Sequence, residues 1–220
     1  MVRLRFETVA ALIIVLASGA SAAQLRPRDE ARSDPSFFEF RQRLIAAVRK
    51  RDRSYVLTIL DPKIRVNFGE GGGAAEFARQ WKLSSTASPL WKTLGEVLSM
   101  GGTFSGTGSN RQFAAPYTYS AFPDTLDAFE HFCVIAPNVP LRAKPDDHSR
   151  VIARLDYDIV RLAAPPRDAK ALAGPWLQVA TAKGKHGYVA RRFLRSPIDY
   201  RALFQKRNGA WRMTALVAGD

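Results

Sequence analysis

Apolar residues recur with helical spacing in the first half of the chain. Asp34 followed by Pro35 is typical of a helix start, because aspartate caps the first turn and proline fits its first position. The apolar positions that follow lie three or four residues apart and define one helix face: Phe37, Phe40, Leu44 and Val48. The pattern predicts an amphipathic helix that begins at Pro35.

Shorter elements are expected around this helix. Apolar spacing and the chain breakers predict helices over residues 53–60, 74–81 and 90–100, and an alternating strand over residues 64–68. The preceding residues, 24–34, are polar and show no periodicity. We therefore expect them to form a disordered leader.

From residue 129 onward the chain shows the alternation that is typical of strands. Short apolar and polar runs are separated by Gly, Pro or Asn. Asn208-Gly209 lies between two such runs and indicates a tight hairpin. A lone hairpin needs a sheet partner, so we expect residues 195–220 to return to the first half of the chain.

Residues 137–194 carry several motifs in a fixed order. The matching residues are Val139, Leu141, Arg142 and Pro145, then Val151, Ile152 and Leu155, and last Trp176, Val179, Gly184, Gly187, Tyr188 and Val189. This series resembles the bacterial SH3-like domain family. The resemblance implies a small β-barrel over residues 134–194, with Trp176, Val189 and Leu155 inside it. It also implies binding to cell-wall peptides, glycans or other proteins.

The flanking segments are similar to the cone-shaped fold of nuclear transport factor 2-like proteins. They offer two helices, a strand after Asp61-Pro62, a further helix and a final hairpin that contains Trp211. The expected fold class is therefore α+β. Helices and a small antiparallel sheet would occupy residues 35–133, and the SH3-like barrel would interrupt this unit before residues 195–220 complete it.

The first 23 residues have the three regions of a signal peptide. Arg3 and Arg5 precede an apolar run over residues 9–17, and Ala20-Ser21-Ala22 fits a cleavage site. The run is too short to span a bilayer, so we expect a periplasmic or secreted protein without a transmembrane segment after cleavage.

The chain has 220 residues and a formal net charge of +13. Such a charge favours anionic partners, and export makes nucleic acid the poorer choice among them. We expect a cell-wall polymer, an envelope protein or another anionic surface as the partner. The alternative is that the charge serves solubility alone.

The chain lacks the residue sets that are typical of catalysis. His131 and Cys133 would share one strand face as a thiol–imidazole pair or two metal ligands, but a third orienting residue is missing, and packing is the commoner role. Asp146-Asp147-His148 reads as a polar turn. We expect no enzymatic activity, no metal and no cofactor.

The candidate binding residues are basic and aromatic. Lys183, Lys185, Arg191 and Arg192 follow the closing strands of the expected barrel, with Tyr188 between them and Arg195 just beyond. Alternation along a strand would place some of them on one outer face. Tyr117, in an aromatic-rich loop, is a further candidate, although packing is its more common role.

The leading hypothesis is a non-enzymatic exported binding module whose SH3-like barrel engages peptidoglycan or a protein partner. The alternative is a small-molecule-binding or catalytic pocket in the cone, lined by His131, Trp81 or Trp91, with the barrel as an accessory. A third possibility is a structural envelope protein with no discrete ligand.

Overall fold

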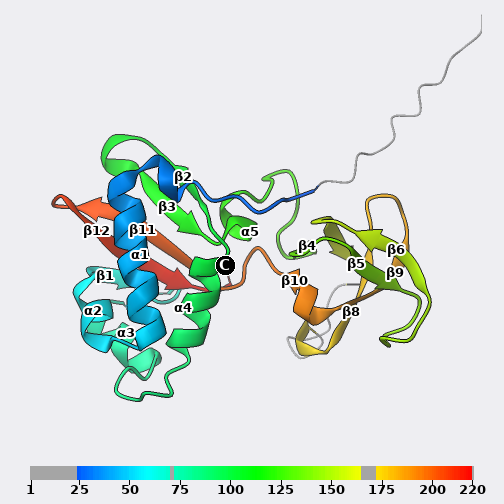
Figure 1. Cartoon of the computed structure of the whole chain (residues 1–220), viewed down its shortest axis with the longest axis horizontal. Helices are drawn as coiled ribbons and strands as arrows, with labels where there is room; N and C mark the ends of the chain where they lie inside the picture. The colour runs from blue at the N-terminus through cyan, green and yellow to red at the C-terminus, as the bar shows by residue number, and fades with distance from the viewer. Residues whose placement is uncertain (1–23, 70–71, 165–171, 220) are drawn as a thin grey trace, which may run out of the picture.

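The chain folds into an α+β unit and a β unit, which lie side by side (Figure 1). The structure is a computed structural model and describes residues 24–69, 72–164 and 172–219. The expected signal peptide, residues 1–23, lies outside these ranges. The fold class is α+β, as expected, with a five-stranded sheet and a seven-stranded sheet.

Four helices cover one face of the five-stranded sheet (Figure 1). They are α1 (Pro35–Lys50), α2 (Arg53–Thr58), α3 (Ala74–Gln80) and α4 (Leu90–Ser99). The start predicted for α1 is confirmed, because an Asp34 carboxylate oxygen accepts a hydrogen bond from Phe37 N at 3.1 Å and Pro35 occupies the first position. The helix ends where Arg51 takes a left-handed conformation, with a φ of 54°.

The C-terminal hairpin lies at the centre of the five-stranded sheet. The strand order is β1 (Leu60–Arg65), β12 (Ala210–Val217), β11 (Arg201–Arg207), β3 (Gln112–Ala115) and β2 (Thr103–Ser105). The hairpin turn predicted at Asn208-Gly209 is confirmed: both residues have positive φ, and Arg207 pairs with Ala210. The hairpin therefore joins strands that come from opposite ends of the first half of the chain.

Strand β1 differs from its prediction in position and direction. It begins at Leu60 and runs through Asp61-Pro62, which the sequence suggested as a helix stop, and it ends at Arg65 instead of Phe68. It pairs in parallel with β12, so the sheet is mixed instead of antiparallel. Pro62 is tolerated because β1 is an edge strand, where a missing N–H breaks no ladder.

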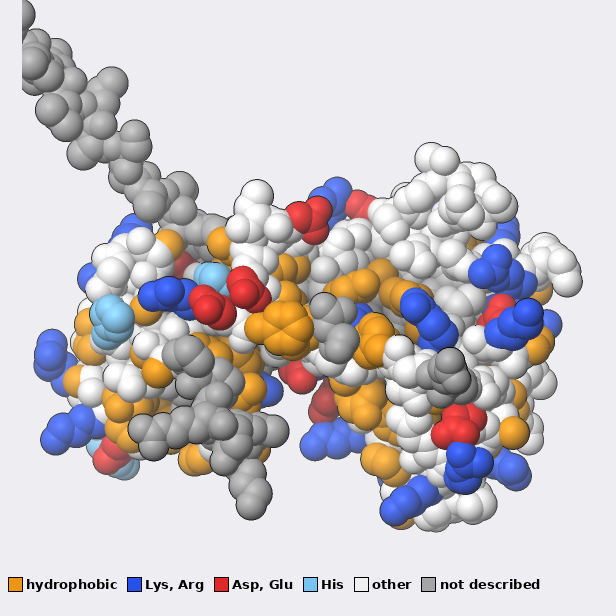
Figure 2. All heavy atoms as spheres, turned by 180° about the vertical axis from the view of Figure 1, so that it is seen from behind, with side chains coloured by type: hydrophobic (Ala, Val, Ile, Leu, Met, Phe, Trp, Pro, Cys, Tyr) orange, Lys and Arg blue, Asp and Glu red, His pale blue; other side chains and the backbone are white. Residues whose placement is uncertain are grey.

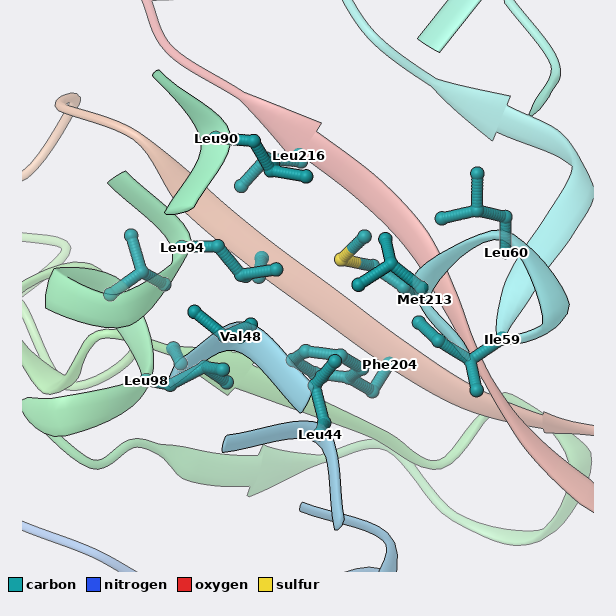
Figure 3. Packing of buried hydrophobic residues seen from close by; sticks show 14 of the residues in the cluster. Leu44, Val48, Ile59, Leu60, Leu90, Leu94, Leu98, Phe204, Met213 and Leu216 are labelled. Atoms are coloured by element: carbon teal, nitrogen blue, oxygen red, sulfur yellow. The ribbon is translucent and has the colours of Figure 1, made fainter. Parts of the chain in front are cut away.

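The core of this unit is filled with large side chains from the helices and the hairpin. Leu44 and Val48 of α1 and Leu94 of α4 pack against Phe204 and Met213 of the hairpin (Figure 3). The Phe37 ring adds further packing at 4.3 Å from Phe113 and 4.8 Å from Trp211, centre to centre. Trp81 and Trp91, proposed above as pocket walls, are instead buried members of this core.

The second unit is built on the seven-stranded sheet. Its strands hydrogen-bond in the order β10 (Leu194–Arg195), β4 (His131–Val134), β7 (Ile159–Leu162), β8 (Trp176–Ala180), β9 (His186–Ala190), β5 (Val139–Arg142) and β6 (Val151–Leu155). The unit begins at His131, three residues earlier than the expected boundary. The order is linear: between the described residues of β6 and β10, the two edge strands, no pairing closes the sheet into a barrel.

The interior of this unit differs from the expectation at one key position. Leu155 and Val189 are buried, as predicted, but Trp176 is only half-buried and Leu177 points inward in its place. Side chains alternate between the two faces of a strand. With Leu177 on the inner face, Trp176 lies on the outer face.

Residues 24–31, expected to be disordered, instead connect the two units. Gln24 forms a bridge with Asp158 of the second unit, and the Leu25 N–H donates to Tyr157 O at 2.8 Å. Further along, Asp29 forms a bridge with Gly102 of the first unit. This segment, blue in Figure 1, runs between the two units. We call residues 24–31 the strap. Its sequence shows neither helical nor strand periodicity, because its residues bind the backbone of neighbouring segments instead of forming a helix or strand of their own.

Candidate functional site

The structure separates the basic residues that the sequence grouped together. Lys183 and Lys185 lie in the turn between β8 and β9, whereas Arg191 and Arg192 follow the other end of β9. A strand advances about 3.3 Å per residue, so the five residues of β9 hold the two pairs ~17 Å apart. Tyr188 lies between them, half-buried and paired across the sheet with Gln178. These residues therefore form two basic sites and not one patch.

The arginines at the far end of β9 line a cleft between the two units. The cleft measures about 490 Å³. Helix α4 forms one wall, and the 3-10 turn η3 (Arg191–Phe193), β10 and the linker to β11 form the other. Figure 2 shows an indentation between the two units with basic and acidic side chains beside it. The lining residues are Thr93, Glu96, Ser99, Met100, Ile135, Arg191, Arg192, Leu194, Arg195, Asp199 and Tyr200.

Arg195 is the central cation of this cleft. Its Nη2 donates to Tyr200 O at 2.7 Å, while its buried Nε has no hydrogen-bond partner among the described residues. No carboxylate in the described ranges lies within 4.0 Å of its guanidinium nitrogens. Burial lowers the pKa of Arg195, while Asp199 and Glu96 raise it. The cleft thus contains a partly desolvated guanidinium without a contact ion pair.

Arg191 is held mainly by the protein itself. Its Nε donates to Leu172 O at 3.2 Å, its Nη1 donates to Leu194 O, and its Nη2 lies 3.6 Å from an Asp199 carboxylate oxygen. Its guanidinium carbon is 5.5 Å from the centre of the Phe132 ring. These contacts fix Arg191 as part of the cleft wall.

Arg192 is much freer than Arg191. Its side chain is 60% exposed, and its Nη2 lies 3.3 Å from an Asp147 carboxylate oxygen. Because an exposed ion pair contributes little, Arg192 can turn toward an anion in the cleft at small cost. Asp147 belongs to the stretch predicted to be a polar turn, where the Asp146 carboxylate accepts the His148 N–H.

Two carboxylates complete the charged lining of the cleft. Asp199 extends from the linker, beside Arg191. Glu96 extends from α4, where its only ion pair among the described residues is with Lys92, at 4.0 Å between Nζ and Oε1. The sequence analysis missed both acids. Glu96 lies on a helix of the first unit, far from the arginines in sequence, whereas Asp199 follows Arg195 by only four residues and was overlooked.

Tyr117, the remaining candidate, does not form part of an exposed binding surface. It is 2% exposed and packs in the seam between the units with Leu25, Cys133 and Ile159. Burial, together with nearby Cys133, raises the pKa of Tyr117 to about 12. Its hydroxyl has no partner among the described residues, and the side chain serves to join the two units.

The other residues considered for chemistry are dispersed. The His131 Nδ1 lies 2.8 Å from Asp127 O, near the surface, while Cys133 is fully buried in the seam. Burial raises the pKa of the Cys133 thiol to about 12, although Arg195 lowers it somewhat. The imidazole and the thiol thus contact different groups, Asp127 O near the surface and the buried seam. Over the described ranges no group of three or more His, Cys, Asp or Glu residues is placed to hold a metal ion.

Comparison with known proteins adds little to this picture. No protein-family model and no curated protein matches the chain. One similar solved structure is a designed nuclear transport factor 2-like protein, titled as an Rd1NTF2 variant. The similarity covers 83% of this chain and 95% of that chain, with 9% identity and a TM-score of 0.31, which establishes neither a fold nor a function. Among the described helices, none has both the length and the apolar character needed to cross a bilayer.

Proposed function

We propose that this chain is a non-enzymatic exported binding protein that holds an anionic group of an envelope component, peptidoglycan or a protein partner, in the cleft between its two units. The observation that carries the proposal is Arg195, a partly desolvated guanidinium that lines the cleft without a contact ion pair. A ligand carboxylate or phosphate would supply that pair. Such charge-assisted hydrogen bonds are the strong ones in binding sites.

The second unit supports an SH3-like assignment through its motif residues. Val139, Leu141, Leu155 and Val179 are buried in a single cluster. Position 187 requires glycine, because the Cβ of any other residue would lie 2.7 Å from Arg142 O, which is too close. This buried cluster is compatible with the family resemblance, and we propose the SH3-like fold for residues 131–195 on that basis.

The first unit supports a binding role more than a catalytic one. Its layered helices and sheet are compatible with the cone-shaped fold proposed from the sequence. Its interior, however, is occupied by aromatic and aliphatic side chains, with Trp81 and Trp91 among them, and His131 lies on the other sheet. The pocket that the catalytic alternative needs therefore has none of its proposed walls in place.

Export rests on the sequence of residues 1–23, and it defines the ligands that the cleft would meet. In the envelope these are peptides, glycans and lipids that carry carboxylates and phosphates. Without Arg3, Arg5 and Glu7 of the signal peptide the net charge is +12, which would favour the encounter, while the cleft would provide the specific contact.

Sedimentation of the mature chain with purified peptidoglycan sacculi tests this proposal. We expect binding, and we expect Arg192→Glu and Arg195→Gln to weaken it by about tenfold or more, since each removes a cation from the cleft. Arg192 is exposed, so its variant should keep the fold, which circular dichroism can check. Binding that survives both substitutions would contradict the proposed site.

The matched control uses the basic pair at the other end of β9. The double variant Lys183→Glu, Lys185→Glu changes the charge by more than Arg192→Glu but leaves the cleft intact. We expect it to bind sacculi nearly as well as the wild type at physiological salt. Equal loss in the control and the cleft variants would indicate non-specific attraction by net charge.

A further inference from the structure

The cleft carries both signs of charge, and this restricts the ligands it suits. Arg191, Arg192 and Arg195 line it together with Glu96 and Asp199. A simple polyanion would gain from the arginines but would be repelled by the two carboxylates. A ligand that carries a cation next to its anion would instead pair with both kinds of side chain.

Glu96 is the carboxylate that is available to a ligand cation. Asp199 is already engaged, since its carboxylate lies 3.6 Å from Arg191 Nη2. Glu96 faces the cleft from α4, and its neighbour Lys92 is 85% exposed and 4.0 Å away, a weak surface pair. Because this surface pair contributes little, a ligand ammonium can replace Lys92 at Glu96 at small cost.

We propose that the cleft selects a short zwitterionic peptide, with the ligand carboxylate at Arg195 and the free ammonium group at Glu96. This inference rests on the proposed function and adds the class of ligand to it. The walls fit this class, because the apolar side chains of Met100 and Ile135 line the cleft together with the charged groups. The cleft volume of about 490 Å³ lies within the range of small-ligand sites.

The site is formed by both units, so its shape depends on how they are joined. Glu96 and Met100 come from the first unit, whereas Arg192 and Leu194 come from the second. The strap and the buried seam around Tyr117 and Cys133 lie next to the cleft, since Ser99, Met100 and Ile135 line both the cleft and the hollow beside the strap. The two charged ends of a ligand would therefore contact different units.

Titration calorimetry of the mature full-length chain tests the inference with three probes. Dialanine carries both charges, N-acetyl-dialanine carries the carboxylate alone, and dialanine amide carries the ammonium alone. We expect dialanine to bind about tenfold more tightly than either capped probe, because each cap removes one charged contact. Equal or tighter binding of N-acetyl-dialanine would overturn the inference.

Two variants separate this inference from the proposed function. Glu96→Gln should remove the preference for dialanine over N-acetyl-dialanine, whereas Arg195→Gln should weaken both probes. The control is Glu39→Gln, which removes one exposed carboxylate from α1 far from the cleft lining and should change neither affinity. If no probe binds while sedimentation with sacculi still depends on Arg195, the anion site stands and the zwitterion inference is wrong. If sedimentation is independent of Arg195, the proposed site itself is wrong.

Discussion

Both carboxylate oxygens of Asp29 lie within hydrogen-bond distance of a single nitrogen of Arg41, Nη1, at 2.6 Å and 2.7 Å. Arg41 is 6% exposed and also donates from Nη2 to Leu98 O at 2.8 Å. This pair fastens the strap to helices α1 and α4. The strap residue thus neutralises a buried cation of the first unit, while Leu25, four residues earlier, contacts the second unit.

We predict that Asp29→Asn will loosen the strap and destabilise the chain by ~1–3 kcal/mol, because it leaves the buried Arg41 cation without its counter-charge. Denaturant unfolding measures the loss. Hydrogen exchange should show faster exchange at the Leu25 amide, which donates to Tyr157 O. Unchanged protection of that amide would mean that the strap does not depend on Asp29.

The second prediction concerns the stability of the chain in acid, which depends on the Asp34 carboxylate. Burial alone would raise its pKa, but hydrogen bonds from Ser36, Phe37 and Arg111 together lower it from 3.8 to about 2. A lowered pKa in the folded state means that the charged form stabilises the fold above about pH 4. That contribution is lost as the pH falls toward 2.

The measurement is the pH dependence of unfolding for the wild type and for Asp34→Asn. The wild type should lose more stability between pH 4 and pH 2 than the variant, which has no charge to lose. Asp34→Ala should in addition cost ~1 kcal/mol at neutral pH, because it removes the cap of α1. A carboxyl titration by NMR with a midpoint near 3.8 would contradict the prediction.

The inward register of β8 gives the third prediction. Leu177 is 5% exposed and fully inside, whereas Trp176 is only half-buried. Leu177→Ala should therefore cost ~2–5 kcal/mol, the usual range for a buried leucine, and Trp176→Ala should cost distinctly less despite its larger side chain. Thermal unfolding of both variants decides the register. A larger loss for Trp176 would place the tryptophan inside, as the sequence first indicated.

Local chemistry explains which elements could be predicted from the sequence. The Asp34 cap and the Asn208-Gly209 turn were predicted correctly because their side chains and backbone preferences act within a few residues. Strand β1 was misplaced because Pro62 signals a break unless the strand is known to be an edge strand, which only the sheet order reveals. Trp176 was placed inside because the family resemblance implied it, although Gln178, which shares its face of the strand, is polar and exposed.

The candidate site was only half predictable for the same reason. Arg191, Arg192 and Arg195 were visible as a cluster in sequence, but the cleft also requires Glu96 on a helix of the other unit. Its position depends on the central hairpin and on the strap, which bring distant segments together. Tyr117 was proposed for a surface because its segment lacked periodicity, but it begins the short helix α5 (Tyr117–Ser120) and packs in the seam.

The fourth prediction concerns the central hairpin. Phe204 is fully buried, with its ring centre 5.7 Å from that of Phe37 and 5.8 Å from that of Phe40. Phe204→Ala should cost ~3–5 kcal/mol, and helical circular dichroism should be lost in the same transition. The control Phe129→Ala removes a phenylalanine that is 56% exposed and should change stability by about 0.5 kcal/mol or less. Equal effects of the two variants would contradict the central position of the hairpin.

The fifth prediction uses Cys133, the single cysteine of the chain, as a reporter of the seam. The side chain is fully buried, and burial raises the thiol pKa from 9.0 to about 12. Because the thiolate is the reactive form, each unit of pKa above the pH lowers its population about tenfold. We expect the native chain at pH 8 to react with a disulfide reagent about a thousandfold more slowly than the chain in denaturant, where one thiol per chain should be counted.

Asp29→Asn should accelerate the native reaction if the strap holds the seam closed, while Glu39→Gln should not. Stoichiometric labelling of the native wild type within minutes would show that the two units separate readily, and the cleft between them would then have no fixed shape.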